Sequence, residues 1–101
     1  MDTVMIYGFR GEYLGKTEYE YNAPEIGAVH KCMLFLSQNE PNANYEDALA
    51  ECKKYGFGNV QITGAGPLKV DVLTTDQFSE FTVFYEEALN EGSALVYYPN
   101  A

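Results

Sequence analysis

His30, Cys32 and Cys52 are the residues of this sequence whose types suit nucleophilic or acid–base catalysis. A cysteine hydrolase needs a thiol and a histidine base within hydrogen-bond reach. In the helix that we expect over residues 23–38, positions i and i+2 point in nearly opposite directions, so His30 and Cys32 do not form such a pair. Cys52 would have to reach His30 through the fold. A packed histidine and two buried thiols are the simpler interpretation.

The glycine clusters and the many carboxylates do not form a recognisable cofactor or metal site. A phosphate-binding loop must open a helix, so that its N–H groups face the phosphate. The glycines of residues 8–15 lie in a predicted hairpin, and those of 64–66 lead through Pro67 into a predicted strand. No EF-hand ligand order surrounds Asp71 and Asp76, and a single histidine removes His-paired metal sites. We therefore expect no catalytic residues, no cofactor and no metal.

Charge is the strongest signal in the composition. The chain has 15 acidic and 6 basic residues, a formal net charge of -9, and no basic side chain follows Lys69. Binding to nucleic acid relies on clustered lysine and arginine, which displace counterions from the phosphates. Direct nucleic-acid binding is therefore disfavoured, whereas the negative field favours association with a basic protein partner.

The predicted helix from Thr74 or Thr75 to about residue 90 carries the candidate partner-binding surface. At about 100° per residue, its core-facing stripe comprises Phe78, Phe81, Tyr85, Ala88 and Leu89. The opposite face comprises Asp76, Glu80, Val83, Phe84, Glu87 and Glu91. Two apolar residues among carboxylates have the composition of a binding hot spot with charged surroundings. The alternative is a solvated helix face with Phe84 at the boundary of the core.

A hairpin is expected at the amino terminus, where residues 4–9 and 17–21 have strand patterns separated by glycine-rich turns. Asn22, followed by a proline and a glutamate, is a typical helix start, so we expect a helix over residues 23–38. Because Phe35 falls on the side opposite to the apolar stripe of that helix, a buried strand is the alternative.

The second half of the chain adds the remaining elements. Asn44 caps a helix whose apolar residues recur at helical spacing until Gly56; they are Tyr45, Ala48, Leu49 and Cys52. Strands are expected over residues 59–63, 68–73 and 94–98. The order ββααββαβ predicts a single α+β domain over residues 1–101, with a mostly antiparallel sheet and two to three helices packed on one face.

The cellular compartment follows from the first residues and from the apolar runs. Residues 1–5 lack the basic stretch and apolar run of a secretory signal. The longest apolar run, 32–36, is far shorter than the roughly 18 residues that a membrane span requires. We therefore expect a cytoplasmic protein without a membrane span, whose two cysteines are reduced.

Taken together, these features predict a non-enzymatic acidic protein that inhibits or neutralises a basic protein partner. Bacterial immunity proteins and antitoxins are short, acidic and free of cofactors in the same way. One alternative is a phage-encoded nucleic-acid mimic that inhibits a nuclease complex, such as an anti-CRISPR. Two more function classes fit the sequence, namely a small enzyme or ligand-binding domain and a structural module that self-associates through a sheet edge. The oligomeric state is left open.

Overall fold

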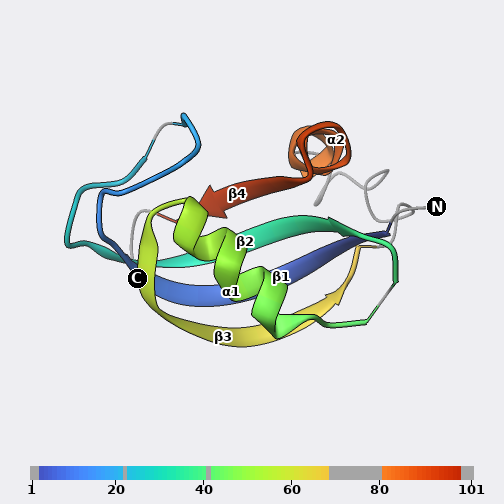
Figure 1. Cartoon of the computed structure of the whole chain (residues 1–101), viewed down its shortest axis with the longest axis horizontal. Coiled ribbons are helices and arrows are strands. Elements are labelled where there is room, and N and C mark those ends of the chain that lie inside the picture. Colours follow the sequence, from blue (N-terminus) through green and yellow to red (C-terminus); the bar gives the residue numbers. More distant parts are fainter. Residues whose placement is uncertain (1–2, 22, 41, 69–80, 99–101) are drawn as a thin grey trace.

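The computed structural model describes residues 3–21, 23–40, 42–68 and 81–98. They form six elements in the order ββαβαβ (Figure 1). The elements are β1 (Thr3–Tyr13), β2 (Val29–Gln38), α1 (Tyr45–Lys54), β3 (Phe57–Pro67), α2 (Thr82–Glu91) and β4 (Ser93–Tyr97). The predicted α+β class is confirmed at this level, because four strands form one antiparallel sheet and two helices accompany it.

The sheet has the strand order β3-β1-β2-β4, and every neighbouring pair is antiparallel. Within the described part of the chain, β1 and β2 are therefore the central strands, and β3 and β4 form the two edges. Tyr7 of β1 lies opposite Leu34 of β2, which in turn lies opposite Leu95 of β4. The pairing of β1 with β3 changes register twice, between Gly8 and Phe9 and between residues 10 and 12, as β-bulges do.

Two predictions for the first part of the chain are wrong. Residues 17–21 form no strand, because β1 extends to Tyr13 and pairs with β2 and β3 instead. In place of the helix expected over residues 23–38 stand a loop and then β2, which confirms the alternative of a buried strand. The physical reason is that both faces of β2 are covered around Phe35, where three successive residues, Leu34 to Leu36, are buried. Such a strand has a nearly continuous apolar run, which periodicity does not separate from a buried helix.

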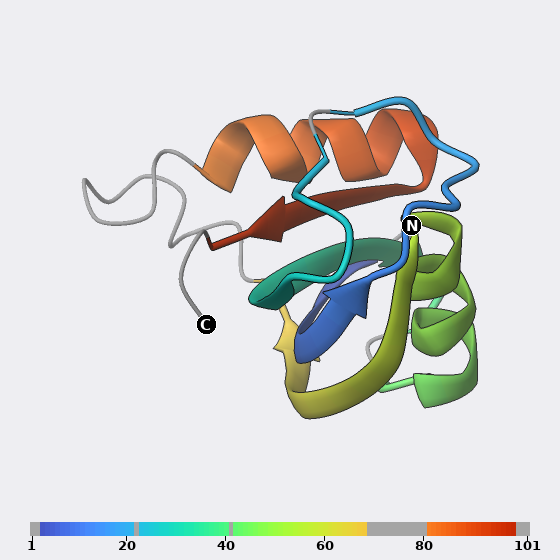
Figure 2. The same cartoon turned by 90° about the vertical axis from the view of Figure 1, so that its left-hand side faces the viewer.

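The two helices pack against opposite faces of the sheet, so the prediction that all helices share one face is wrong (Figures 1 and 2). The core cluster on the α1 side contains Met5, Tyr7, Phe9, Tyr13, Cys32, Leu34, Leu36, Ala48, Cys52, Tyr55, Phe57 and Leu95. The cluster on the α2 side contains Val4, Phe35, Ala88 and Ala94. Successive residues of a strand point to opposite faces, so alternate apolar positions of the central strands supply the two cores.

The bounds of α1 agree with its predicted caps. The Asn44 side chain accepts a hydrogen bond from the Asp47 N–H at 3.1 Å, which satisfies one of the free donors at the start of the helix. Lysines occupy the last turn, and Gly56 follows with a φ of 93°, a conformation that glycine adopts without strain.

The end of the last helix and the last strand also lie close to their predicted positions. α2 ends at Gly92, whose φ is 98°, and β4 begins one residue before the predicted strand. The predicted cap at Thr74 or Thr75 lies outside the described residues. So does the predicted strand over residues 68–73, except for Leu68, which belongs to no strand. No helix of the described segments is long and apolar enough to cross a membrane.

Candidate binding surface

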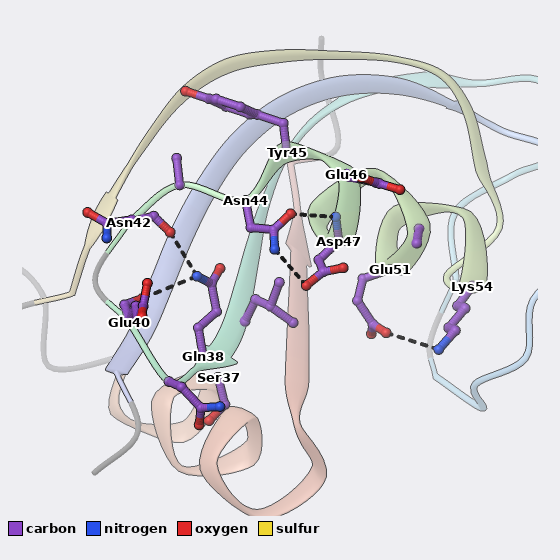
Figure 3. Close-up of a pocket in the computed structure, with 14 residues that line it drawn as sticks. Ser37, Gln38, Glu40, Asn42, Asn44, Tyr45, Glu46, Asp47, Glu51 and Lys54 are labelled. Atoms are coloured by element: carbon purple, nitrogen blue, oxygen red, sulfur yellow. Dashed lines mark hydrogen bonds and ion pairs between the residues drawn. The ribbon is translucent and has the colours of Figure 1, made fainter.

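A cleft of about 880 Å³ lies between α1 and the chain segment that connects the end of β2 to it (Figure 3). It is lined by Leu36, Ser37, Gln38, Asn39, Glu40, Asn42, Ala43, Asn44, Tyr45, Glu46, Asp47, Ala50, Glu51 and Lys54. Four of these residues are carboxylates and one is a lysine, so the walls carry an excess of negative charge. We call this site the acidic cleft. A concave surface of one sign concentrates the electrostatic field and favours ligands of the opposite charge.

The floor of the acidic cleft is tied to the core of the sheet through Gln38 and Tyr7. The Gln38 amide donates hydrogen bonds to the backbone carbonyls of Asn42 at 2.9 Å and Glu40 at 3.3 Å (Figure 3). Its carbonyl oxygen accepts a hydrogen bond from the hydroxyl of the buried Tyr7. That hydroxyl in turn accepts from the Asn44 N–H at 2.8 Å. The described residues of the connection are therefore tied to the sheet before any partner arrives, which lowers the entropic cost of binding.

The first turn of α1 forms the acidic rim of the cleft. Glu46 and Asp47 are exposed at the amino end of the helix, where the partial positive charge of the helix dipole stabilises carboxylates. The Asn44 amide donates to the Asp47 carboxylate at 2.9 Å, while the Asn44 oxygen accepts from the Asp47 N–H. This reciprocal pair fixes the direction of the Asp47 side chain, and Glu46 remains free to point into solvent.

At the far end of the cleft, the Glu51 carboxylate is contacted by three side chains, two of which come from outside α1. Its carboxylate accepts hydrogen bonds from Ser93 at 2.8 Å and Tyr19 at 3.0 Å, and it lies 3.2 Å from the Lys54 ammonium. The Tyr55 hydroxyl lies 3.0 Å from the Ser93 oxygen, to which it donates, because the Ser93 proton is committed to Glu51. These contacts join α1 to β4 and to the loop after β1.

The pKa values at this end of the cleft reflect burial and the Glu51 carboxylate. Burial raises the pKa of Tyr55 to about 12. Burial, followed by the hydrogen bond to Glu51, raises the pKa of Tyr19 above its ordinary value. Both phenols therefore stay protonated as donors, and Glu51 serves to position α1.

A second, apolar groove of about 360 Å³ runs along the other flank of α1 and shares Tyr45 with the acidic cleft. It is lined by Tyr45, Leu49, Val60, Ile62, Thr63 and Gly64. We call it the α1–β3 groove. Of the four apolar residues that recur at helical spacing in this helix, Tyr45 and Leu49 are not part of the core, because they are 52% and 43% exposed. α1 buries Ala48 and Cys52 instead, so that its Tyr45 and Leu49 flank faces outward beside β3.

The candidate surface predicted on the last helix is only partly described. Asp76 and Glu80 lie outside the described residues. Glu87 and Glu91 are exposed on α2, and Val83 is 68% exposed. Phe84 is partly buried and stacks on Phe35, with their ring centroids 5.9 Å apart. That packing agrees with the alternative in which Phe84 lies at the boundary of the core.

The described residues predicted to face the core from the last helix are partly buried and partly exposed. Phe81 and Tyr85 are packed against the α2-side core, and Ala88 is fully buried, as predicted. Leu89 is 43% exposed, so its assignment to the core is wrong. Whether the acidic face of α2 contacts a partner remains a prediction.

His30 and Cys32 lie on the same face of the sheet, because β2 is a strand and positions i and i+2 of a strand point the same way. The Nδ1 atom of His30 lies 2.7 Å from the Tyr98 carbonyl oxygen and donates to it. Its Nε2 atom is buried and has no hydrogen-bond partner among the described residues. The Cys32 Sγ atom lies 3.7 Å from the His30 carbonyl oxygen, to which the thiol donates.

The two cysteines are buried free thiols in the structure. Burial raises the pKa of Cys32 and of Cys52 to about 12. A thiol with such a pKa is protonated at neutral pH, and the protonated form is not the nucleophile. Neither cysteine nor His30 lines the acidic cleft or the α1–β3 groove.

The acidic cleft was not foreseen in the sequence. The sequence predicts Asn44 as a cap, but Tyr45 stands out only as one of the apolar residues at helical spacing. The tether between Tyr7 and Gln38 joins residues 31 positions apart and leaves no local pattern. The available signal was Glu46 and Asp47 directly after Tyr45, which places two carboxylates beside an aromatic ring at a helix start.

Within the described segments, no group of three His, Cys, Asp or Glu side chains is placed to hold a metal ion. Comparisons with protein-family models, with curated proteins and with solved structures gave no match.

Proposed function

We propose that this chain is a non-enzymatic acidic binding protein that docks a basic protein partner at the acidic cleft and so inhibits or neutralises it. The observation that carries the proposal is the position of Tyr45. Its half-exposed ring stands at the rim of a preorganised cleft and directly precedes two exposed carboxylates. Tyrosine is enriched among residues that dominate binding energy, and surrounding charges speed the encounter and select the partner.

The charge distribution of the chain supports a basic partner. The whole chain carries a formal net charge of -9, so a basic protein is attracted from a distance, while nucleic acid is repelled. The carboxylates of Glu40, Glu46 and Asp47 are exposed at the cleft, whereas Glu51 is paired with Lys54. Three carboxylates are therefore available to a cationic surface. Immunity proteins, antitoxins and nucleic-acid mimics all use acidic surfaces of this kind, and the acidic cleft suits each of them.

The test compares two charge-reversed baits that differ only in where the charge changes. Glu40→Lys with Glu46→Lys alters the acidic cleft, and Glu87→Lys with Glu91→Lys alters α2. Each Glu→Lys change adds two charges, so both baits have a net charge of -9 + 4 = -5 and the same loss of overall attraction. The native chain and both baits are immobilised, and proteins captured from a bacterial lysate are identified and quantified by mass spectrometry.

We expect a basic protein that is captured by the native chain and by the α2 bait and is lost from the cleft bait. Equal capture by all three proteins would contradict docking at the acidic cleft. Loss from the α2 bait alone would move the docking surface to the acidic face of α2.

A further inference from the structure

The outer edge of β3 carries no charged side chain over its 11 residues, Phe57–Pro67, although charged residues make up 21% of the chain. β3 is an edge strand of the described sheet, with β1 on one side and no described strand on the other. Exposed edges offer free N–H and C=O groups to another strand, and proteins usually place charges there to prevent pairing. Among the described residues, the features of β3 that oppose such pairing are Pro67 and the register shifts opposite β1.

The α1–β3 groove lies directly beside this edge. Its walls are Tyr45 and Leu49 of α1 on one side and Val60 and Ile62 of β3 on the other. A peptide that adds a strand to an edge points alternate side chains to each face of the sheet, and a groove between the edge strand and a helix receives one set of them. An apolar groove of about 360 Å³ suits aliphatic side chains.

The charges around the groove define which segment fits it. α1 carries Glu46 and Asp47 in its first turn and Lys53 and Lys54 in its last turn. A basic segment is therefore attracted to the Tyr45 end of the groove, where the acidic cleft begins, and repelled from the other end. A second copy of the chain would bring another net charge of -9 to this surface, which opposes self-pairing.

We propose that an extended segment of the basic partner adds a strand to the outer edge of β3, with apolar side chains in the α1–β3 groove and basic side chains beside the acidic cleft. This inference rests on the proposed function, because it uses the same partner, and adds how that partner is held. The backbone of the segment pairs with β3, which supplies affinity without a specific sequence, and the groove and the cleft supply selectivity.

The probe is a fluorescent peptide of alternating lysine and valine, about as long as β3, added to the full chain. Binding is followed by fluorescence anisotropy, and the contact is located by amide hydrogen exchange. Two control peptides have the same length. One is N-methylated at alternate backbone amides, which removes the donors of one strand edge, and the other replaces lysine with glutamate.

A matched pair of variants tests the groove without disturbing the core. Leu49 lies in the groove and Leu89 on α2, and both are 43% exposed on a helix. Leu49→Lys places a charge in the apolar groove and repels the basic peptide, whereas Leu89→Lys adds the same charge elsewhere. We expect the first change to weaken peptide binding about tenfold or more and the second to change it less than about twofold.

The inference is supported if the lysine–valine peptide slows exchange in β3 and both control peptides lose this effect. It is overturned if no peptide slows exchange in β3, or if the N-methylated peptide and Leu49→Lys behave as their unmodified counterparts. If the N-methylated peptide and Leu49→Lys have no effect but the Glu40→Lys and Glu46→Lys variant loses binding, the proposed function stands and only the strand addition to β3 is rejected. If exchange in β3 slows as the protein concentration rises in the absence of any peptide, the occupant of the edge is a second copy of the chain, and the inference is also overturned.

Discussion

α1 and α2 both present carboxylates to solvent, but they use their aromatic residues in different ways. On α1, Tyr45 stands exposed beside Glu46, and the chain that precedes it is tied to the sheet. On α2, Phe84 stacks on Phe35 and belongs to the packing of the core. The difference teaches that an acidic helix face is not sufficient for a docking site. The Tyr45 ring has an edge contact with Tyr7, with centroids 6.2 Å apart, but it stays 52% exposed, and an aromatic residue can anchor a partner through the part of its ring that the fold leaves exposed.

The support beneath the two helices differs as well. α1 is fixed at its start by the Asn44 cap and at its end by the Glu51 contacts to Ser93 and Tyr19. Within its described bounds, α2 has no side-chain hydrogen bond at its N-cap, and its buried contact is centred on Ala88. A surface held from several sides loses less entropy on binding, which favours α1 as the docking platform.

The largest expected effect is on the reactivity of Cys52, which lies on the buried side of α1. Its reaction with an alkylating reagent shows whether the helix stays packed on the sheet. The pKa of Cys52, like that of Cys32, is raised by burial from 9.0 to about 12, so the thiolate fraction near neutral pH falls about a thousandfold relative to an unfolded chain. Alkylation followed by mass spectrometry should label neither thiol in the native protein and both in denaturant. Rapid labelling of native Cys52 would show that α1 is not a fixed platform.

The same pKa shifts determine how stability depends on alkaline pH. The thiols ionise near pH 9.0 when unfolded and near 12 when folded, so between these values the folded state holds more protons. The contribution of the two thiols to the free energy of unfolding is therefore completely present below pH 9, and it declines as the pH rises toward 12. Denaturant titrations across this range should show the decline, and a constant midpoint would contradict the burial of both thiols.

The next largest effect is the difference in stability between alanine variants of Phe84 and Val83, which are neighbours on α2. Phe84→Ala removes a ring that stacks on the core, so we expect the free energy of unfolding to fall by about 2 to 3 kcal/mol. Val83→Ala changes an exposed side chain and should cost about 0.5 kcal/mol or less. Chemical denaturation measures both. If Phe84→Ala left stability unchanged, the ring would be free to bind a partner, and the contrast between the helices would disappear.

Local signals in the sequence predicted the elements whose ends are fixed locally. The cap at Asn44 and the glycines at 56 and 92 predicted where α1 begins and where both helices end. β2 is harder to predict, because both of its faces are covered around Phe35 and the alternation that identifies a strand is lost there. Whether a strand is covered on one face or two depends on the whole fold, and no local pattern contains that information.

The candidate site was harder to predict than the fold for a similar reason. Tyr45 has the same spacing as Ala48 and Cys52, so periodicity alone assigns all three to the core. A helix that crosses only part of a sheet buries a narrow line of residues and leaves its flank exposed. The tether from Tyr7 to Gln38 and the contact of Glu51 with Ser93 join distant segments, so both became visible only in the folded chain.

The binding kinetics of Tyr45→Ala test the central claim most directly, with the basic partner captured by the native chain as the ligand. We expect dissociation to be faster by an amount that corresponds to about 2 kcal/mol, because a hot-spot aromatic acts through the lifetime of the complex. The stability of the free protein should change by less than about 1 kcal/mol, because the ring is half exposed. Unchanged dissociation in Tyr45→Ala, together with faster dissociation in Phe84→Ala at equal stability, would contradict docking at α1 and place it on α2.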